Sequence, residues 1–238
     1  MSLQERVAIV TGAGRGLGRR IAEELAGRGA RVALVARGRE EIAAVAAGIA
    51  SRGGEALALP ADVGRWSEAA GVVAAVEQRH GAVDLLVNNA GSGWYKPFLE
   101  WSPEEIAQSL DSSLAGTIWM CRAALPGMVA RRRGHVVNIA SDLARRPLAN
   151  MAVYVAAKQG VLGFSQSLLR EVKSQGIKVS AILPGIVDTA FGGSREGSRD
   201  PAWAMSPEWV ARQIVDLLEA PGTWVVDELT LHPLGQDF

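Results

Sequence analysis

The chain has 238 residues, enough for one α/β domain to bury a continuous core without a second module. Its 25 basic and 25 acidic residues cancel, which excludes a charge-driven partner such as nucleic acid or an anionic membrane and leaves a small molecule as the expected ligand. A lone cysteine, Cys121, cannot form an intrachain disulfide or a cysteine-based zinc site. The N-terminus has no signal-peptide pattern and no apolar run is long enough to cross a bilayer, so we expect a cytoplasmic protein.

Short β-branched runs alternate with alanine-rich stretches of helical length along the chain. This alternation is typical of a parallel sheet whose strands are joined by crossover helices. We expect strands at residues 6–11, 31–35, 55–59, 84–87, 135–139, 178–183 and 224–227, with helices between them. No internal repeat or linker divides the chain, so residues 1–238 are predicted to form a single α/β domain: a doubly wound parallel sheet of about seven strands with helices on both faces.

A glycine-rich turn follows the first predicted strand and leads directly into a helix that begins near Leu17. Glycine allows the backbone to approach a pyrophosphate closely, and the helix N-terminus offers unpaired N–H groups and the positive end of its dipole. The turn does not match G-x-G-x-x-G, and it lacks the lysine of a P-loop, which argues against an ATPase or kinase. Its place at a strand-to-helix junction predicts a dinucleotide site formed by Gly12, Gly14, Arg15, Gly16, Leu17 and Gly18.

The end of the second predicted strand carries Ala36 and Arg37, where NAD-specific sites usually place an acidic residue that binds the ribose 2′-hydroxyl. An arginine instead attracts a 2′-phosphate through forked hydrogen bonds, and Arg15 in the glycine turn is a second cation. We therefore expect NADP(H) rather than NAD(H). The simpler alternative is that Arg37 is a solvated residue at a strand end.

Helix boundaries have their own local signals. Ser102 stands three residues before Glu105 with Pro103 between them, which predicts a capping box, and Ser206 begins a helix in a similar way. The three arginines at 131–133 are interpreted as a helix end, with the glycine that follows, Gly134, as its left-handed cap.

Tyr154 and Lys158 are four residues apart at the start of a helical pattern, so they project from one helix face. A nearby ammonium favours the phenolate, and we expect Lys158 to lower the pKa of Tyr154 towards the working range of a proton-transfer group. Ser141 comes just after the strand at 135–139, and ligands of parallel sheets bind outside the carboxyl ends of strands. Ser141 is therefore expected to face the same crevice as the glycine turn and to bond the substrate oxygen.

Residues 188–206 form the one irregular stretch, rich in glycine, serine and charged side chains. We expect a flexible loop over the substrate, although composition alone is equally consistent with a plain surface loop. Trp94, Tyr95 and Trp203 are candidates for the wall of an apolar substrate pocket, or for a subunit contact.

Six motifs follow one another along residues 6–189: Thr11-Gly12-x-x-x-Gly16-x-Gly18, Asp62-Val63, Asn88-Asn89-Ala90-Gly91, Asn138-Ile139-Ala140-Ser141, Tyr154-x-x-x-Lys158 and Pro184-Gly185. In order and spacing they resemble the short-chain dehydrogenase/reductase family. That resemblance implies a Rossmann-like fold, a nicotinamide cofactor, no metal, and a homodimer or homotetramer. It also implies cofactor contacts from Asp62, Val63, Asn89, Ala90, Gly91, Pro184, Gly185, Val187 and Thr189.

The resemblance further implies a division of roles in the reaction. Hydride passes between nicotinamide C4 and a carbonyl carbon, and Tyr154 gives or takes the proton on oxygen. Ser141 orients that oxygen, and Lys158 binds the ribose while tuning Tyr154. The expected protein is an NADP(H)-dependent oxidoreductase that acts on a small carbonyl compound or secondary alcohol.

Two departures from the family pattern stand out. Ser113 occupies the place of an asparagine that relatives are thought to use for a water relay to the lysine, so it is expected to hold a differently placed water or to leave the relay incomplete. The family's frequent glycine-pair ending is also missing from residues 225–233.

Two alternatives remain open. One is a 3-oxoacyl-thioester reductase of the acyl-carrier-protein type, in which Arg145 and Arg146 receive a phosphopantetheine or carboxylate group. The other is a non-catalytic protein that senses NADP(H), suggested by the Ser113 departure. The three histidines are scattered without ligand spacing, so no metal site is expected.

Overall fold

The computed structural model describes residues 2–236 and contains one sheet of seven parallel strands. Their spatial order is β3-β2-β1-β4-β5-β6-β7. The strands are β1 (Val7–Thr11), β2 (Arg31–Ala36), β3 (Glu55–Pro60), β4 (Leu85–Asn88), β5 (Gly134–Ile139), β6 (Ile177–Pro184) and β7 (Glu228–Leu231). The predicted doubly wound α/β domain is confirmed, and the first six strands lie within a residue of their expected bounds.

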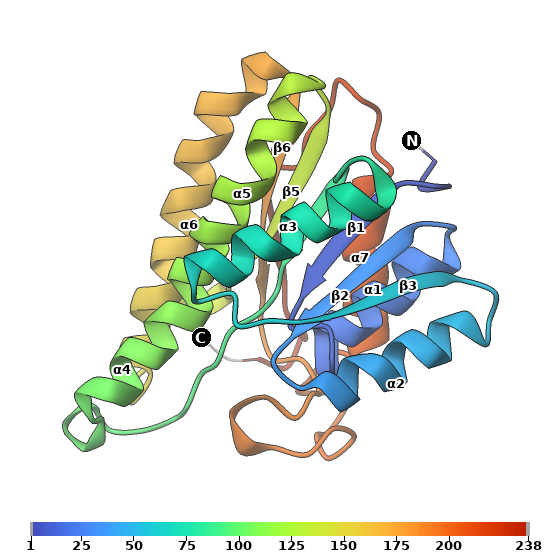
Figure 1. Ribbon diagram of the computed structural model, residues 1–238. Helices are drawn as coiled ribbons and strands as arrows, with labels where there is room; N and C mark the ends of the chain where they lie inside the picture. Colours follow the sequence, from blue (N-terminus) through green and yellow to red (C-terminus); the bar gives the residue numbers. More distant parts are fainter. Residues whose placement is uncertain (1, 237–238) are drawn as a thin grey trace.

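Helices cover both faces of the sheet (Figure 1). They are α1 (Gly16–Gly27), α2 (Arg39–Ala50), α3 (Trp66–His80), α4 (Pro103–Leu110), α5 (Gly116–Ala130), α6 (Ala152–Val172) and α7 (Pro207–Leu218). One core cluster joins α1, α2 and α7 to the sheet, and a second joins α3, α5 and α6 to its other face. None of the helices between residues 2 and 236 combines the length and apolarity that a bilayer crossing needs.

The predicted position of the last strand was wrong. The run at 224–227 suggested a strand because Trp224, Val225 and Val226 have β-forming side chains, but all three are exposed. The strand begins at Glu228 instead, where Leu229 and Leu231 pack against the core cluster of α1 and α7. Burial of these two leucines sets the register of β7 on β6.

Both predicted helix starts are confirmed. Ser102 and Glu105 form a reciprocal capping box at the start of α4, and Ser206 Oγ accepts a hydrogen bond from Trp209 N at the start of α7. The predicted end of α5 was only partly right. Arg132, with φ +51°, takes the left-handed conformation, whereas Gly134 already belongs to β5. A Cβ at Gly134 would lie 2.5 Å from Met128 Sδ, so glycine is needed there for close packing and not for a cap.

The amino end of the sheet is fastened by one buried carboxylate. Asp84, just before β4, accepts hydrogen bonds from Val7 N at 3.1 Å and from Arg133 Nη2 at 2.7 Å, and it pairs with Arg6 at 3.4 Å. Burial alone would favour the neutral acid, but the bonds from Arg133 and Val7 hold the pKa of Asp84 below its ordinary value. Asp84 therefore ties together the starts of β1, β4 and β5, at the end of the sheet opposite the crevice.

At the carboxyl end, the strand order reverses direction between β1 and β4. Neighbouring crossovers leave a crevice at such a switch point, and ligands of doubly wound sheets bind there. In Figure 1 the segment after β6, coloured orange, and α4, at the end of a long connection from β4, both project from this end of the molecule.

Candidate active site

A cavity of about 800 Å³ opens at the carboxyl ends of the strands. The glycine turn, the end of β2, and the segments after β3, β4, β5 and β6 all contribute to its wall. The predicted site residues that line it are Gly12, Gly14, Arg15, Gly16, Leu17, Gly18, Arg37, Asp62, Val63, Asn89, Ala90, Gly91, Ser141, Tyr154, Lys158, Pro184, Gly185, Val187 and Thr189. Of the residues predicted to bind the cofactor or take part in the reaction, Ser113 lies outside this lining.

The glycine turn brings two backbone segments closer than side chains would allow. Gly12 has φ +65°, and a Cβ at Gly18 would lie 2.3 Å from both Gly12 O and Asn89 Nδ2. The first turn of α1 has no side-chain cap and no acidic residue. Its N–H groups and the positive end of its dipole therefore face the cavity ready for an anion.

The segment after β4 is bound tightly to this turn. Thr11 Oγ1 accepts hydrogen bonds from the backbone N–H groups of Asn89 and Ala90, each at 3.0 Å. The Asn89 side chain returns a bond to Thr11 O, also at 3.0 Å. These bonds fasten the segment after β4 to the end of β1 at the wall of the cavity.

Two cations and one anion lie at the β2 end of the cavity. Arg15 and Arg37 are exposed, and both line it. Glu41, which we had not singled out in the sequence, also lines it, and Cβ atoms at Gly14 and Gly38 would lie 2.9 and 2.7 Å from its Oε2. A bound phosphate would therefore meet one carboxylate as well as the two guanidinium groups.

Tyr154 lies on α6, and its phenol is buried and interacts with Ser141. Burial raises the pKa of Tyr154 to about 12; the interaction with Ser141 lowers it, and the charge of Asp142 raises it further. A phenol with this pKa is protonated at neutral pH, so it is a proton donor.

Lys158 occupies the same face of α6, and its Nζ lies 5.7 Å from the centre of the Tyr154 ring. Nζ donates a 2.6 Å hydrogen bond to the carbonyl of Ile139, and burial lowers the pKa of Lys158 to about 8. The expected lowering of the Tyr154 pKa by this ammonium is not seen: burial raises that pKa, and the Lys158 ammonium is directed at the β5 carbonyl.

Ser113 lies in a short π-helix (Asp111–Ala115) between α4 and α5 and is fully buried. Its Oγ accepts a hydrogen bond from Ser92 N at 3.2 Å and bonds Ser92 O at 3.4 Å. A Cβ at Gly91 would lie 3.2 Å from Ser113 Oγ and 3.5 Å from Lys158 Nζ, so Gly91 separates the two groups.

Apolar side chains form the outer wall of the cavity. Phe191 packs on Tyr154 with ring centres 5.5 Å apart, and Tyr95, Leu148 and Met151 also line the space. Of the three aromatic residues predicted near the substrate, Tyr95 lines the cavity, whereas Trp94 and Trp203 do not. No local pattern pointed to Phe191, because it lies in the irregular segment.

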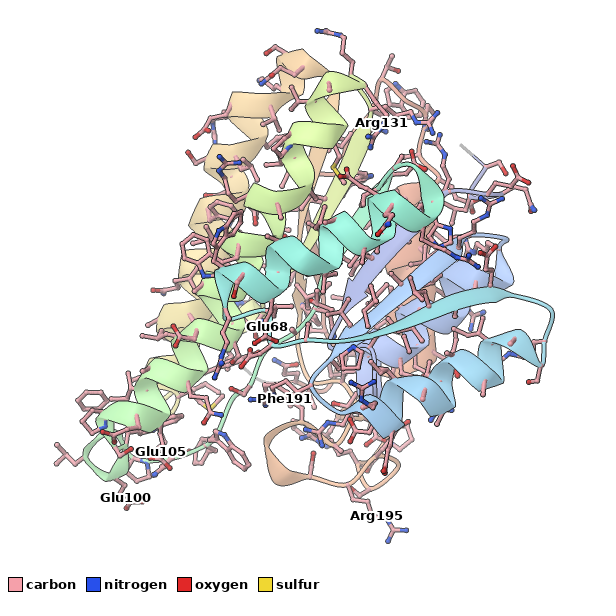
Figure 2. All side chains as sticks on the ribbon, in the orientation of Figure 1. Glu68, Glu100, Glu105, Arg131, Phe191 and Arg195 are labelled. Atoms are coloured by element: carbon pink, nitrogen blue, oxygen red, sulfur yellow. The ribbon has the colours of Figure 1, made fainter. Side chains whose placement is uncertain are left out.

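The segment 188–206 is anchored at several points. Val187 and Met205 bridge its ends, Glu196 pairs with Arg20 at 3.0 Å, and Arg199 donates to Ser194 Oγ. Figure 2 shows Phe191 at its inner side and Arg195 pointing outward at its tip. The segment thus presents an apolar ring to Tyr154 and charged side chains to solvent.

The hypothesis that Arg145 and Arg146 receive a phosphopantetheine or carboxylate group finds little geometric support. Arg145 pairs with Glu228 at 2.5 Å, and neither Arg145 nor Arg146 lines the cavity. Within residues 2–236, the His, Cys, Asp and Glu side chains form no group of three that could ligate a metal ion. His135 is buried in β5, where it bonds Ser180 Oγ at 2.8 Å.

Asp142 and Gln236 also line the cavity and were missed in the sequence. Asp142 directly follows Ser141, and this adjacency was the available signal; Gln236 reaches the cavity only because the chain returns to it after β7.

A seven-stranded parallel sheet with a glycine turn and a buried Ser141–Tyr154 pair defines a nucleotide-dependent oxidoreductase fold. Residues 6–199 match the family described as short chain dehydrogenase, and the chain belongs to the short-chain dehydrogenase/reductase family of oxidoreductases.

Particular relatives can be compared with it. Two proteins of Pseudomonas putida are similar to it in sequence. A 1,6-dihydroxycyclohexa-2,4-diene-1-carboxylate dehydrogenase is 38% identical over 90% of this chain and 77% of its own. A 2,3-dihydroxy-2,3-dihydro-p-cumate dehydrogenase is 37% identical over 79% of this chain and 73% of its own. The alcohol dehydrogenase of Thermococcus sibiricus, solved with 5-hydroxy-NADP, has a TM-score of 0.93 at 29% identity and covers 98% of this chain and 99% of its own.

Proposed function

We propose that this protein is an NADP(H)-dependent oxidoreductase that interconverts a carbonyl compound and a secondary alcohol, with Tyr154 as the general acid and base. The observation that supports this most strongly is the meeting, in one cavity, of an uncapped helix N-terminus with the buried phenol of Tyr154 and the hydroxyl of Ser141.

The cavity suits a nicotinamide dinucleotide. Gly12 and Gly18 have no side chain and so can lie close to their neighbours. The backbone N–H groups in the first turn of α1 have no side-chain cap and can donate hydrogen bonds to a pyrophosphate. The residues after β6, including Val187 and Thr189, would hold the nicotinamide end, and Lys158 the adjoining ribose. When bound, the cofactor supplies or accepts the hydride.

A preference for NADP(H) is supported by charge. Arg15 and Arg37 supply two guanidinium groups at the end of the cavity where an adenosine 2′-phosphate would lie. Glu41 opposes them with one negative charge, so the preference rests on the arginine pair. The Thermococcus sibiricus enzyme of similar fold was solved with an NADP derivative.

The protein's own residues handle the proton. In the reductive direction, the Tyr154 phenol donates its proton to the carbonyl oxygen while Ser141 orients that oxygen. In the oxidative direction the phenolate removes the alcohol proton, which requires alkaline conditions because burial raises the pKa of Tyr154 to about 12. Ser113 acts as a positioning residue, since its hydroxyl fixes the Ser92 backbone beside Gly91.

The substrate that fits the outer wall is apolar and cyclic. Phe191, Tyr95, Leu148 and Met151 offer rings and aliphatic surface next to the phenol. The two Pseudomonas putida relatives are named for cyclic dihydroxy carboxylates, which supports the cyclic part of this proposal. The segment 188–206 is proposed to act as a flexible loop that covers this substrate. A cytoplasmic homodimer or homotetramer is proposed by analogy with the family, and light scattering would determine the assembly.

The test combines turnover with cofactor binding. The wild-type protein is expected to oxidise NADPH with cyclic ketones, and Tyr154→Phe should lower kcat by about 10² to 10⁴ while binding NADPH as before. Binding is followed by the fluorescence of NADPH, which does not depend on turnover. NADPH binding with no turnover across ketones and 3-oxoacyl thioesters would reject the enzyme and favour a sensor, and activity confined to the thioesters would favour the acyl-carrier-protein reductase.

A further inference from the structure

A buried carboxylate lies beside the proposed catalytic pair. Asp142 is 4% exposed, and its Oδ1 accepts a 3.2 Å hydrogen bond from Ser141 Oγ. Ser141 Oγ in turn accepts a bond from Leu143 N at 3.2 Å. The Ser141 proton is therefore directed at Asp142 unless a ligand takes it, and the orientation of the hydroxyl depends on this carboxylate.

The carboxylate is held from the other side by the C-terminal segment. Gln236 Nε2 donates a 2.5 Å hydrogen bond to Asp142 Oδ2, and Gln236 Oε1 accepts one from Ile186 N at 3.0 Å. Because the Ile186 N–H can only donate, the amide is fixed with its NH₂ group towards the carboxylate. A Cβ at Gly185 would lie 2.3 Å from Gln236 Oε1, so glycine is needed there for the side chain to enter.

Few charges act on the Tyr154 phenol. Asp142 approaches from the turn after β5, and Lys158 lies on the same helix with its ammonium directed at Ile139 O. The segment after β6 contributes the uncharged ring of Phe191. His232 lies beyond Gly185, where a Cβ on that glycine would meet both His232 Cβ at 3.0 Å and Asp142 Oδ2 at 3.1 Å.

We propose that Asp142, anchored by Gln236, is a positioning residue that orients the Ser141 hydroxyl and places a negative charge beside the proposed catalytic pair. The proposal rests on the proposed function for its catalytic consequence. Alcohol oxidation needs the Tyr154 phenolate, and the negative charge of Asp142 raises the pH at which this phenolate forms. Carbonyl reduction needs the neutral phenol, which persists through neutral pH. The raised pKa of Tyr154, to which Asp142 contributes after burial, agrees with this.

The kinetic test replaces Asp142 by asparagine, which keeps the size and removes the charge. The pKa on the rising limb of kcat/KM for oxidation of a secondary alcohol by NADP⁺ is expected to fall by about one pH unit. Glu100→Gln is the matched control, because Glu100 is an exposed carboxylate at the outer end of the arm formed by residues 94–110 (Figure 2). An unshifted limb in Asp142→Asn would overturn the proposal, and Asp142→Ser serves the same purpose if asparagine prevents folding.

A second measurement does not depend on turnover. The chain has only two tyrosines, so two signals are expected when ¹³Cζ-labelled tyrosine is followed by NMR across a pH titration. Tyr95→Phe and Tyr154→Phe assign them, and circular dichroism monitors the fold at each pH. The Tyr154 midpoint, or its first onset if alkaline unfolding intervenes, should move down in Asp142→Asn and stay in place in Glu100→Gln.

The outcomes separate the two proposals. A lower Tyr154 midpoint in a protein that turns over no substrate would reject the proposed function and leave the electrostatic role of Asp142 standing. Turnover with unmoved midpoint and unmoved pH limb would reject the role of Asp142 alone. Gln236→Ala should lower kcat about tenfold, the loss of one anchoring hydrogen bond, with NADPH affinity unchanged; an unchanged kcat would overturn the anchoring role of Gln236.

Discussion

Replacement of Gly18 by alanine should damage the cofactor site through one misplaced methyl group. The new Cβ would lie 2.3 Å from Gly12 O and from Asn89 Nδ2, so either backbone or amide must move by about 1 Å to reach ordinary contact. That movement breaks the Asn89 side-chain bonds to Thr11 O at 3.0 Å and Gly12 O at 3.3 Å. Two lost hydrogen bonds at about 1 kcal/mol each, with overpacking of about 1–3 kcal/mol, give roughly 3–5 kcal/mol of destabilisation.

For a domain of this size, such a loss lowers Tm by roughly 5–20 °C. NADPH affinity, measured by cofactor fluorescence, should fall at least about tenfold because the pyrophosphate loses its aligned N–H groups. Gly71→Ala is the matched control: Gly71 lies inside α3, and a Cβ there would meet no atom within 4 Å, so alanine should leave binding intact and stabilise by up to about 1 kcal/mol. A Gly18→Ala protein with wild-type Tm and NADPH affinity would refute the close-approach reasoning.

Three further outcomes are expected. Asp84 has a lowered pKa in the folded protein, so its contribution to stability is complete above the unfolded pKa of about 4 and is lost as pH falls through the folded pKa. Asp84→Asn should therefore lower Tm at pH 7 more than at pH 3. An equal loss of Tm at both pH values in thermal scans would contradict this. Arg37→Ser should raise KM for NADPH about 10- to 100-fold and leave KM for NADH nearly unchanged in steady-state assays, whereas equal effects on both cofactors would show that Arg37 does not contact the 2′-phosphate. Burial raises the pKa of the Cys121 thiol to about 12, so this thiol should react with a disulfide reagent only after unfolding, and rapid labelling of the native protein would exclude the buried position.

The parts of the fold that could be predicted are those whose signals are local. Six strands are recognisable as short, largely apolar runs between turn residues, and the capping box at Ser102 fixed the start of α4. The seventh strand was misplaced because an exposed apolar run at 224–226 resembles a strand more than the half-polar run that packs on the core. Gly134 was misjudged for a similar reason, since only the packed position of Met128 shows why glycine is needed.

The residues of the candidate site likewise fall into those with a local sequence signal and those placed only by the tertiary fold. Tyr154, Lys158, Ser141 and the glycine turn lie in contiguous motifs, so spacing alone brings them to the carboxyl edge of the sheet. Gln236 could not be predicted because its place depends on how the chain after β7 folds back onto Gly185. The pKa of Tyr154 was equally hidden, since it is governed first by burial, a property of the whole cavity.

The Thr11 hydroxyl has a consequence for the thermodynamics of ligand binding. This hydroxyl accepts hydrogen bonds from the backbone N–H groups of Asn89 and Ala90. It thereby joins the end of β1 to the segment that follows β4, and this part of the cavity wall is ordered by the protein's own contacts. Little association free energy is then consumed in ordering this part of the receptor. Calorimetry on a Thr11→Val protein should reveal this preorganisation as a larger entropic penalty for docking the dinucleotide.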